Sequence, residues 1–435
     1  MTYIKLKKKK IAIIGGGISG LSAAYLLSND YDISLYESKS KLGGHAITLG
    51  KIMPDHNGKL KKFFFDIGFL VYNERNYPNF KKLLQRIKVK TEKSSMSFSV
   101  SSEESNFEYG STGLLSITNN FKNIFRKDFW IMLFDIIKFY KLSKKYINNQ
   151  SNHNLTLDSF LKKNKFSNIF IRKHIIPMCG AIWSTSSKEV LNMPTKYILV
   201  FLDNHGLLNI SKRPKWLTIS NGSINYVKKL EESIVGKIFK NEKVIYVERK
   251  RKKVFIQSKS FSKQYDKVIF AIHSDEILNI LKQPNNEEIA VFSKCKYETN
   301  IILVHQDPKL MPKNKNVWSS WNVINGSSKS NIKNKICVTY WINKLQNLQT
   351  KYPILVTLNP PLEQKINKKR ILKRLKLKHP LLEKNHLSIC KKVNFLQGKN
   401  MTYYTGAWLG YGFHEDGLKA SSSIVKLINL RKKND

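Results

Sequence analysis

Three glycines near the N-terminus have the spacing of a loop that binds a dinucleotide. Gly15, Gly17 and Gly20 follow directly on the apolar run 11–14. In such a loop the first glycine makes a tight turn, the second lets the backbone approach a pyrophosphate, and the third lets the next helix pack on the strand. Glu37 follows at about the spacing of a β-α-β unit, where its carboxylate would accept hydrogen bonds from ribose hydroxyls. Together these residues predict a nucleotide site.

The elements that must position these residues are a strand, a helix and a second strand. Residues 11–14 are mostly β-branched and end at glycine, which is typical of a buried parallel strand. We expect a helix over 18–28, whose N-terminal amides would point at the phosphate, and a second strand over 33–37. The basic N-terminus and the apolar run also resemble a signal peptide, but glycines interrupt the run and no small-residue cleavage site follows it. We therefore expect the chain to stay in the cytoplasm.

The composition indicates a large globular protein with an extreme charge. The chain has 435 residues, 41% of them hydrophobic, and a formal net charge of +45. Lysines occur in every segment beside many Asn and Ile residues, as codon bias in an AT-rich genome would produce; attraction to an anionic lipid surface is the alternative. No nucleic-acid-binding motif accompanies the charge, so we expect no nucleic-acid partner. The widely spaced cysteines predict neither a disulfide framework nor a zinc site: Cys179, Cys295, Cys337 and Cys390.

Residues 129–140 are the aromatic stretch most suited to contact with a membrane. Asp135 and Lys138 interrupt it, and no window of the sequence has the roughly 20 uninterrupted apolar residues that a spanning helix needs. As an amphipathic helix it would either pack in the core or lie on a lipid surface. It is flanked by Lys127, Lys141, Lys144 and Lys145.

The rest of the chain alternates predicted strands and helices. We expect helical, aromatic-rich material over 114–210, a helix over 224–234, a β-hairpin of 243–248 with 253–258, a buried strand over 265–272, strands over 301–305 and 336–341, a lysine-rich helix over 364–377, a strand and turn over 402–407, and a last helix ending at 429.

Two more glycine-containing turns follow the first loop. Gly43 and Gly44 precede His45, and Asp66-Ile67-Gly68 ends an apolar segment. Backbone without a Cβ atom can run close along a diphosphate and a planar ring. We therefore expect the chain to approach a bound cofactor at three places.

These motifs resemble the FAD-binding core of the amine oxidase and carotenoid desaturase superfamily. A closer resemblance is to a bacterial branch whose genes often neighbour cyclopropane-fatty-acid-synthase-like methyltransferases. The resembling segments run through the whole chain: 68–75, 96–100, 181–185, 203–208, 318–322, 338–341 and 410–418. The resemblance implies an α/β fold, with a Rossmann-like FAD-binding domain of the amine oxidase/glutathione-reductase-2 type and an inserted α+β substrate domain. It places the discontinuous FAD-binding domain at 1–72, 214–283 and 395–435, and the substrate domain at 73–213 and 284–394.

The resemblance also implies non-covalently bound FAD and no metal. The residues that it assigns to the cofactor are Gly15, Gly17, Ile18, Ser19, Gly20, Glu37, Ser38, Lys41, Gly43, Gly44, His45, Asp66, Gly68, Phe69, Val244, Gly406, Glu415, Asp416, Gly417 and Leu418. Ala407 stands where many members have an acidic residue, so Glu415 or Asp416 would have to replace it. The start of the last helix would face the flavin pyrimidine edge, where negative charge accumulates on reduction.

The sequence does not identify the catalytic residues. For every candidate, core packing or a structural hydrogen bond is the alternative role. Trp318, Trp321 and Tyr411 add to an aromatic set that favours an apolar tunnel, and flavin chemistry requires no nucleophile. The candidates are His174, Trp183, His205, Tyr340, Trp341 and His414.

We expect an FAD-dependent oxidoreductase that transfers hydride between flavin and a long apolar substrate, such as the fatty acyl chain of a phospholipid. The lipid substrate rests on the genomic neighbourhood of the similar proteins. Expected partners are this substrate, an anionic membrane surface on the inner face, and the methyltransferase. The alternatives are a flavin amine oxidase, a carotenoid desaturase or isomerase, a non-catalytic FAD-bearing protein that delivers lipid, and a nicotinamide dehydrogenase.

Overall fold

The fold contains a parallel sheet of the kind that the first glycine loop predicts. A computed structural model describes residues 8–102, 107–110, 121–149, 155–209, 213–325, 335–361, 366–381 and 386–434. Five parallel strands lie in the order β10-β2-β1-β14-β20, which differs from their order along the chain. Their bounds are β1 Lys10–Ile14, β2 Asp32–Tyr36, β10 Gly236–Phe239, β14 Lys267–Phe270 and β20 Thr402–Tyr404.

Both faces of the parallel sheet are covered. Along β1, Ile11 and Ile13 belong to one hydrophobic core, whereas Ala12 and Ile14 belong to another. Because side chains alternate across a strand, the apolar run serves both cores. The first core also contains helices α1 Ile18–Leu27, α2 Pro78–Arg86, α11 Ile224–Ser233 and α16 His414–Asn434. The second contains β11 Val244–Lys250, β12 Lys253–Ser258, β13 Ser262–Tyr265, α12 Ile277–Ile280, α13 Asn286–Phe292 and α15 His386–Leu396.

The predicted hairpin is part of a three-stranded antiparallel sheet, β11-β12-β13. Its turn places Arg251 at φ +48° and Lys252 at φ +58°. Two successive left-handed residues give a turn whose twist matches that of the paired strands. The hairpin prediction is confirmed.

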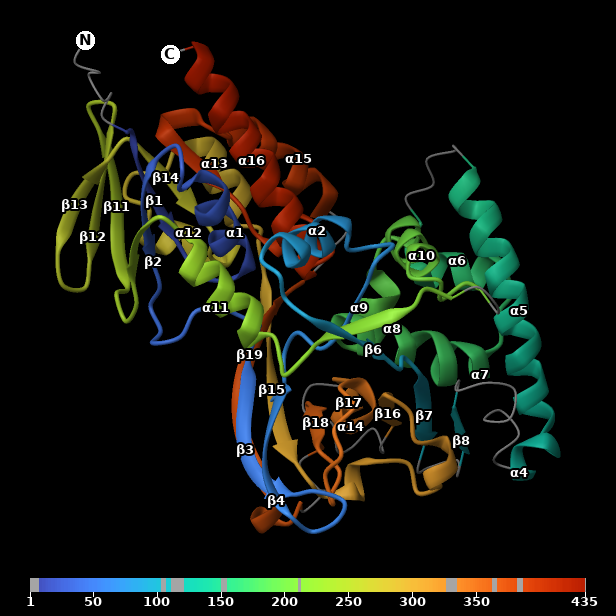
Figure 1. The fold of residues 1–435 in the computed structure, drawn as a ribbon. Helices are drawn as coiled ribbons and strands as arrows, with labels where there is room; N and C mark the ends of the chain where they lie inside the picture. The colour runs from blue at the N-terminus through green and yellow to red at the C-terminus, as the bar shows by residue number, and fades with distance from the viewer. Residues whose placement is uncertain are drawn as a thin grey trace.

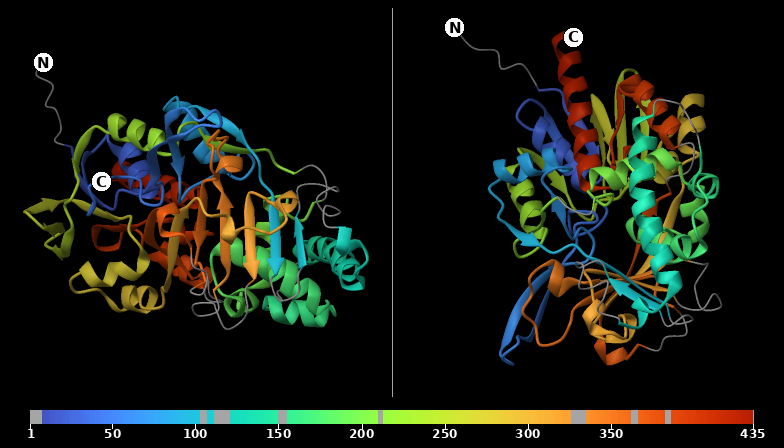
Figure 2. Two further views of the ribbon diagram at one scale, coloured as in Figure 1. Left: turned by 90° about the horizontal axis from the view of Figure 1, so that it is seen from below. Right: turned by 90° about the vertical axis from the view of Figure 1, so that its right-hand side faces the viewer.

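A seven-stranded sheet forms the second main part of the molecule. Its order is β19-β15-β18-β17-β16-β7-β8, and all its neighbours are antiparallel except β16 and β7. Figure 2 shows the cyan strands β7 and β8 beside the orange strands of the same sheet. The bounds are β7 Phe98–Ser102, β8 Phe107–Gly110, β15 Tyr297–His305, β16 Trp321–Asn325, β17 Cys337–Trp341, β18 Leu355–Leu358 and β19 Ile371–Pro380.

The helix predicted over 364–377 is wrong. Residues 371–380 form strand β19, which pairs along its whole length with β15. In this lysine-rich segment Leu375 and Leu377 are two positions apart, the period of a strand, and Leu377 is buried. The start of the predicted helix, at Gln364, lies outside the described residues.

Helices fill the region between residues 121 and 204, as predicted; the rest of the predicted range partly lies outside the described residues. They pack at one side of the seven-stranded sheet, and α5 forms the outer edge of the molecule in Figure 1. No helix among the described residues is long and apolar enough to cross a membrane. The bounds are α4 Phe121–Ile124, α5 Lys127–Asn148, α6 Leu157–Lys163, α7 Asn168–Phe170, the π-helix η1 Ile171–Ile175, α8 Ile176–Trp183, α9 Ser187–Asn192 and α10 Thr195–Asn204.

Two small sheets connect the main parts. Strand β3 pairs with β4, and β5 and β6 both pair with β9. The boundaries of the two predicted domains stay a prediction. The remaining elements are β3 Thr48–Pro54, β4 Leu60–Asp66, β5 Tyr72–Asn73, β6 Thr91–Ser94, β9 Trp216–Ile219, α14 Ile342–Leu345, and the short helices η2 Ser274–Glu276, η3 Pro308–Leu310, η4 Lys315–Val317, η6 Lys368–Arg370, η7 Lys399–Met401 and η8 Ala407–Leu409.

Candidate functional site

A cavity of about 1180 Å³ extends from the first glycine loop to the seven-stranded sheet. Ligand pockets usually measure about 300–1,000 Å³, so this one has room for a ligand larger than a typical small molecule. Its wall includes Gly15, Gly17 and Glu37 at one end, and Trp321 and Leu358 at the other. One continuous space therefore joins the predicted nucleotide loop to an apolar chamber.

The three glycines of the loop have different surroundings. Gly15 adopts φ +110°, and a Cβ atom there would lie 2.5 Å from the Ala271 carbonyl oxygen. A Cβ atom at Gly20 would overlap the Gly15 carbonyl oxygen, because α1 packs tightly on the loop. At Gly17 the nearest atom to such a Cβ would be the Gly44 Cα, 3.9 Å away. Gly17 thus leaves open space in the cavity wall, as close approach to a pyrophosphate requires.

The carboxylate of Glu37 holds the glycine loop in place. It lies at the end of β2, where it accepts hydrogen bonds from the backbone N–H of Gly16 at 2.9 Å and of Lys39 at 2.9 Å, and from the Ser38 hydroxyl at 3.2 Å. A carboxylate has about four acceptor positions, so these bonds leave capacity for a ribose hydroxyl. Glu37 is both a loop support and a residue of the cavity wall.

The second and third glycine turns pack against the first. The Gly43 N–H donates to the Gly16 carbonyl at 2.8 Å, and the Phe69 N–H donates to the His45 carbonyl at 3.0 Å. A side chain at Gly68 would overlap that His45 carbonyl. All three turns line the cavity, so the structure brings the three predicted points of close approach together.

His414 connects the cavity to the N-terminus of α16. Its ring stacks on Phe69 at a centroid distance of 3.7 Å, and its Nε2 shares a hydrogen bond with the Tyr226 hydroxyl at 2.9 Å. Burial, with a smaller contribution from His45, lowers the pKa of His414 to about 3. The imidazole is therefore neutral near pH 7, and it lies at the positive end of the α16 dipole.

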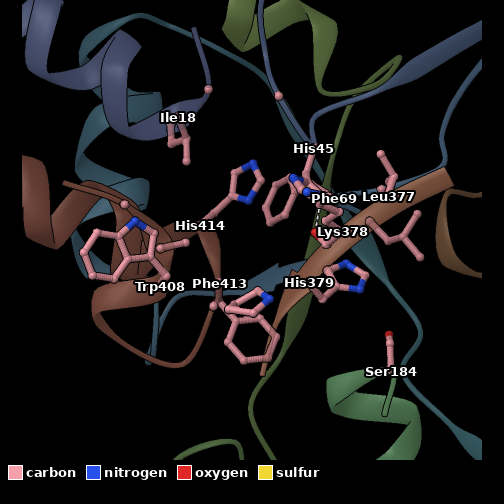
Figure 3. Close-up of a pocket in the computed structure, with 18 of the residues that line it drawn as sticks. Ile18, His45, Phe69, Ser184, Leu377, Lys378, His379, Trp408, Phe413 and His414 are labelled. Carbon is pink, nitrogen blue, oxygen red and sulfur yellow. Dashed lines mark hydrogen bonds between the residues drawn. The ribbon is translucent and has the colours of Figure 1, made fainter. Parts of the chain in front are cut away.

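The rings of His45, His273 and His379 gather beside this position, and Figure 3 labels His45 and His379. His45 lies 5.9 Å from His273 and 5.4 Å from His379, measured between ring centroids. The His45 Nε2 is 3.1 Å from the Lys378 carbonyl, and the His379 Nδ1 is 3.0 Å from the Asn300 amide. Burial lowers the pKa of His45 to about 4 and that of His379 to about 3. The rings therefore offer neutral donors and acceptors to the middle of the cavity.

Sequence reasoning missed His273 and His379. The helix predicted over 364–377 ends before His379, so the sequence gives no reason to place this residue at the site. The pairing of β19 with β15, which does place it there, is a contact between distant segments. The available signal was the alternation of Leu375, Leu377 and His379. His273 follows directly on the strand that was predicted over 265–272, and ends of parallel strands are common positions for ligand contacts.

The far end of the cavity is apolar and aromatic. Helices α8 and α10 contribute Met178, Ile182, Trp183 and Phe201. The seven-stranded sheet contributes Ile302, Trp321, Tyr340, Leu358 and Leu377. Among the described residues the indole N–H groups of Trp183 and Trp321 have no hydrogen-bond partner. This end suits an apolar ligand that carries a few acceptor oxygens.

The rim of this apolar end is basic. Lys93 is on β6 and Lys215 immediately precedes β9, and the two strands pair so that Ser94 lies opposite Trp216. Arg213 lies two positions before Lys215, and all three cationic residues belong to the cavity wall. Their side chains are exposed to solvent. A ligand with an anionic end would therefore be attracted to this rim.

Most of the predicted site residues line the cavity, but nine do not. The lining includes Trp183, His205, Tyr340 and His414 among the catalytic candidates, and Val244 and Gly406 among the cofactor candidates. The cofactor and catalytic roles themselves stay predictions. The residues outside the wall are Gly20, Lys41, Asp66, His174, Trp341, Glu415, Asp416, Gly417 and Leu418.

The acidic residues in this second group bind protein groups. Asp66 accepts hydrogen bonds from the Ser223 N–H and hydroxyl, so it fastens β4 to the start of α11, and burial raises its pKa to about 6. Glu415 accepts from the N–H groups of Asn79 and Phe80 at the start of α2. Asp416 accepts from the Phe413 N–H at 2.9 Å. These bonds give each carboxylate a structural role.

The other members of the second group have equally local contacts. The His174 Nδ1 shares a hydrogen bond with the Tyr109 hydroxyl at 2.7 Å, and Trp341 meets Trp318 edge to face at 5.5 Å. Gly417 lets α16 approach α1, because a Cβ atom there would lie 2.6 Å from the Ser19 hydroxyl oxygen. Leu418 is buried in the core beside them, and Lys41 is exposed.

One group at the cavity wall has the donor atoms of a metal site. His273, Asp275 and Glu276 place ligand atoms within 4.8 Å of one another. The Asp275 carboxylate forms an ion pair with the Lys378 ammonium at 3.2 Å. A cation of the protein thus occupies the position next to this group.

The comparisons agree with this architecture. Residues 13–87 match the model of the NAD(P)-binding Rossmann-like domain. Comparison with curated protein sequences found no match. Among solved structures the chain resembles a CLA-producing fatty acid isomerase from P. acnes, with 15% identity, a TM-score of 0.67 and coverage of 96% of this chain and 98% of that one.

Two further structures have the same fold. Cyclohexylamine oxidase from Brevibacterium oxydans IH-35A has 11% identity and a TM-score of 0.65 over 97% of this chain and 100% of that one. Reduced UDP-galactopyranose mutase has 13% identity and a TM-score of 0.66 over 98% and 95%. At these identities the likeness concerns the fold. The chain therefore has a mixed α/β fold with an NAD(P)-binding Rossmann-like domain, and it shares this fold with isomerase, oxidase and mutase enzymes.

Proposed function

We propose that this protein is an FAD-dependent oxidoreductase that binds FAD without a covalent bond and acts on a long apolar substrate, a fatty acyl chain. The observation that carries the proposal is the single cavity that joins the glycine turns to an apolar chamber. A dinucleotide needs the first part, and an alkyl chain needs the second.

The residues of the cavity fit the parts of FAD. The open space at Gly17 suits the diphosphate, and Glu37 has acceptor capacity for the ribose. The N-terminus of α16, at His414, would hold the flavin ring end. When bound, FAD supplies a two-electron acceptor or donor of hydride. The chain's own residues orient the substrate and exclude water through the apolar chamber.

The basic rim supports a substrate with an anionic end. A fatty acid carboxylate or a phospholipid phosphate at the rim would lie near Lys93, Arg213 and Lys215 while its chain fills the chamber. The fold is also that of a fatty acid isomerase, which agrees with this substrate class. The predicted partnership with a methyltransferase belongs to the same proposal, since such an enzyme also modifies acyl chains.

The experiment has two independent parts. The purified protein should be yellow, and denaturation should release FAD into solution; a colourless protein that binds a nicotinamide dinucleotide instead would refute the cofactor. Anaerobic addition of a long-chain fatty acid or its phospholipid should then change the flavin spectrum, and mass spectrometry should detect a change in unsaturation or double-bond position.

Charge reversal at the rim tests the substrate. We expect Arg213→Glu with Lys215→Glu to raise KM for the fatty acid about tenfold at low salt, since exposed charge pairs contribute up to about 1 kcal/mol each. The matched control is Lys391→Glu with Lys392→Glu on the exposed side of α15, outside the cavity wall. An equal effect of both double variants would contradict the role of the rim.

Amine oxidation is the second candidate, because the fold is shared with cyclohexylamine oxidase. An aromatic wall suits an amine: the rings of Tyr197 and Tyr411 lie 4.2 Å apart, and Tyr411 lines the cavity. An amine is a cation near pH 7, so the rim would repel it. Turnover of amines with release of hydrogen peroxide, increased by the charge reversal, would favour this candidate over the acyl substrate.

A further inference from the structure

Helix α5 exposes a row of large apolar side chains to solvent. The exposed fractions are 46% for Trp130, 68% for Phe134 and 54% for Ile137. The opposite side of the helix is buried in the core through Phe129, Met132 and Phe139. Both the buried and the exposed side of the helix therefore carry apolar residues. We call Trp130, Ile131, Phe134 and Ile137 the α5 stripe.

Basic residues continue the α5 stripe at both ends. In a helix, residues three or four positions apart share a face, so Lys127, Phe134 and Lys141 point to the same side as Trp130. Lys145 lies one turn beyond Lys141, and the lysines at 127, 141 and 145 are exposed. The surface thus has an apolar centre between cationic ends.

The two acidic residues of α5 do not oppose this charge. Asp128 forms an ion pair with Arg126, at 2.9 Å between the guanidinium nitrogen and the carboxylate oxygen. Asp135 is buried and accepts a hydrogen bond from the Ser167 N–H at 2.9 Å. The helix therefore presents a net positive surface to solvent.

We propose that the α5 stripe and its flanking lysines dock the protein on an anionic membrane surface. Aromatic and aliphatic side chains would enter the boundary between headgroups and acyl chains, and the lysines would contact anionic headgroups. Figure 1 and the right-hand view of Figure 2 both place α5 at the outside of the molecule.

The charges favour a membrane over a second copy of the chain. In a symmetric dimer the same face occurs on both sides of the interface, so lysines of one copy would lie near lysines of the other. An anionic bilayer instead complements both the apolar centre and the cationic ends. The abundance of lysine elsewhere in the chain adds long-range attraction to the same surface.

The position of α5 also relates the membrane to the cavity. Helix α5 packs on α10, and Phe201 on α10 and His205 directly after it line the cavity. Docking would therefore leave α10 and α5 between the apolar chamber and the lipid. The proposal rests on the surface alone and holds whichever substrate the cavity takes.

The test is co-sedimentation of the purified protein with vesicles. We expect strong binding to vesicles that contain phosphatidylglycerol and at least tenfold weaker binding to pure phosphatidylcholine, with binding to the anionic vesicles falling as salt rises. Phe134→Ser with Ile137→Ser should reduce the affinity at least tenfold. Lys141→Gln with Lys145→Gln should also reduce it at least tenfold, since each lysine near the surface contributes about a fivefold change.

The control uses a similar surface elsewhere. Helix α15 also exposes Lys391, Lys392 and Phe395 within five consecutive residues, and Phe395 is 75% exposed. The triple variant Lys391→Gln, Lys392→Gln, Phe395→Ser should bind as wild type does. Equal losses in the α5 and α15 variants, or equal binding to neutral and anionic vesicles, would overturn the proposal. A dimer in vesicle-free solution that the Phe134→Ser, Ile137→Ser variant disperses would also overturn it.

Discussion

Replacing Gly17 by aspartate should remove the cofactor and leave the fold intact. Gly17 is the N-cap of α1, with φ −76° and ψ −176°, a conformation that any residue adopts. Its N-cap position lacks a side-chain hydrogen bond, and aspartate is among the preferred residues there. The added Cβ atom would meet nothing closer than the Gly44 Cα at 3.9 Å. We therefore expect the apoprotein to be as stable as wild type or more stable by a few tenths of a kcal/mol.

The effect on binding follows from charge in a partly enclosed space. A phosphate oxygen that passes Gly17 at contact distance would lie about 4 Å from the new carboxylate. At the effective dielectric constant near a protein surface, two like charges at this distance repel by about 4 kcal/mol, which corresponds to roughly a thousandfold loss of affinity. The assay is titration of FAD into each apoprotein, followed by flavin fluorescence, with chemical denaturation of the same apoproteins.

Gly17→Asn separates charge from shape. Asparagine has nearly the same size and is an equally good N-cap, but it carries no charge. We expect Gly17→Asn to bind FAD much more tightly than Gly17→Asp. Wild-type affinity in Gly17→Asp would refute the reasoning. So would equal losses in both variants, and so would an aspartate variant whose apoprotein is clearly destabilised.

Three further predictions concern stability. Gly20→Ala should destabilise the protein by about 3 kcal/mol, because its Cβ would overlap the Gly15 carbonyl; an unchanged denaturation midpoint would contradict the packing. Arg249→Met should lower the free energy of unfolding by about 3–5 kcal/mol, because it leaves the buried Glu288 carboxylate without the guanidinium that lies 2.5 Å from it. In the same denaturation assay Lys399→Met, which breaks the exposed ion pair with Glu287, should lower it by less than about 1 kcal/mol. The free energy of unfolding should fall as the pH drops from about 6.5 towards 3, because the folded protein lowers the pKa values of His45 and His379 to about 4 and 3 and the unfolded chain therefore binds more protons in this range. Chemical denaturation at a series of pH values measures this, and His379→Asn should reduce the dependence of the unfolding free energy on pH.

Local patterns predicted the parts of the site that depend on neighbouring residues. The Gly15 turn, the helix that starts at Ile18 and the second strand are close in sequence, and their periodicities differ clearly. The same holds for the hairpin around Arg251 and Lys252. In these segments a few adjacent residues determine the backbone, so the sequence alone was sufficient.

Contacts between distant segments decided the rest. Lysines form helices well, so the lysine-rich segment at 371–377 favoured the prediction of a helix. Pairing with β15 selects the strand instead. The cluster of His45, His273 and His379 exists because β19 passes the second glycine turn. Glu415 is a further example, since its partners at the start of α2 are more than 300 positions away in the chain.

The parallel sheet also constrains how the protein folds during its synthesis. Strand β20 and helix α16 come from residues 402–434, yet β20 pairs with β14, and Ser421 on α16 donates a hydrogen bond to the Ser19 carbonyl at 2.7 Å. Translation proceeds at about 5–20 residues per second, so the first β-α-β unit emerges from the ribosome well before its covering helix. During this interval the apolar side of α1 is uncovered and vulnerable to aggregation. Capture of the proposed FAD would therefore be a late event, because a nascent chain that stops before residue 402 lacks Gly406, Trp408 and His414 of the cavity wall.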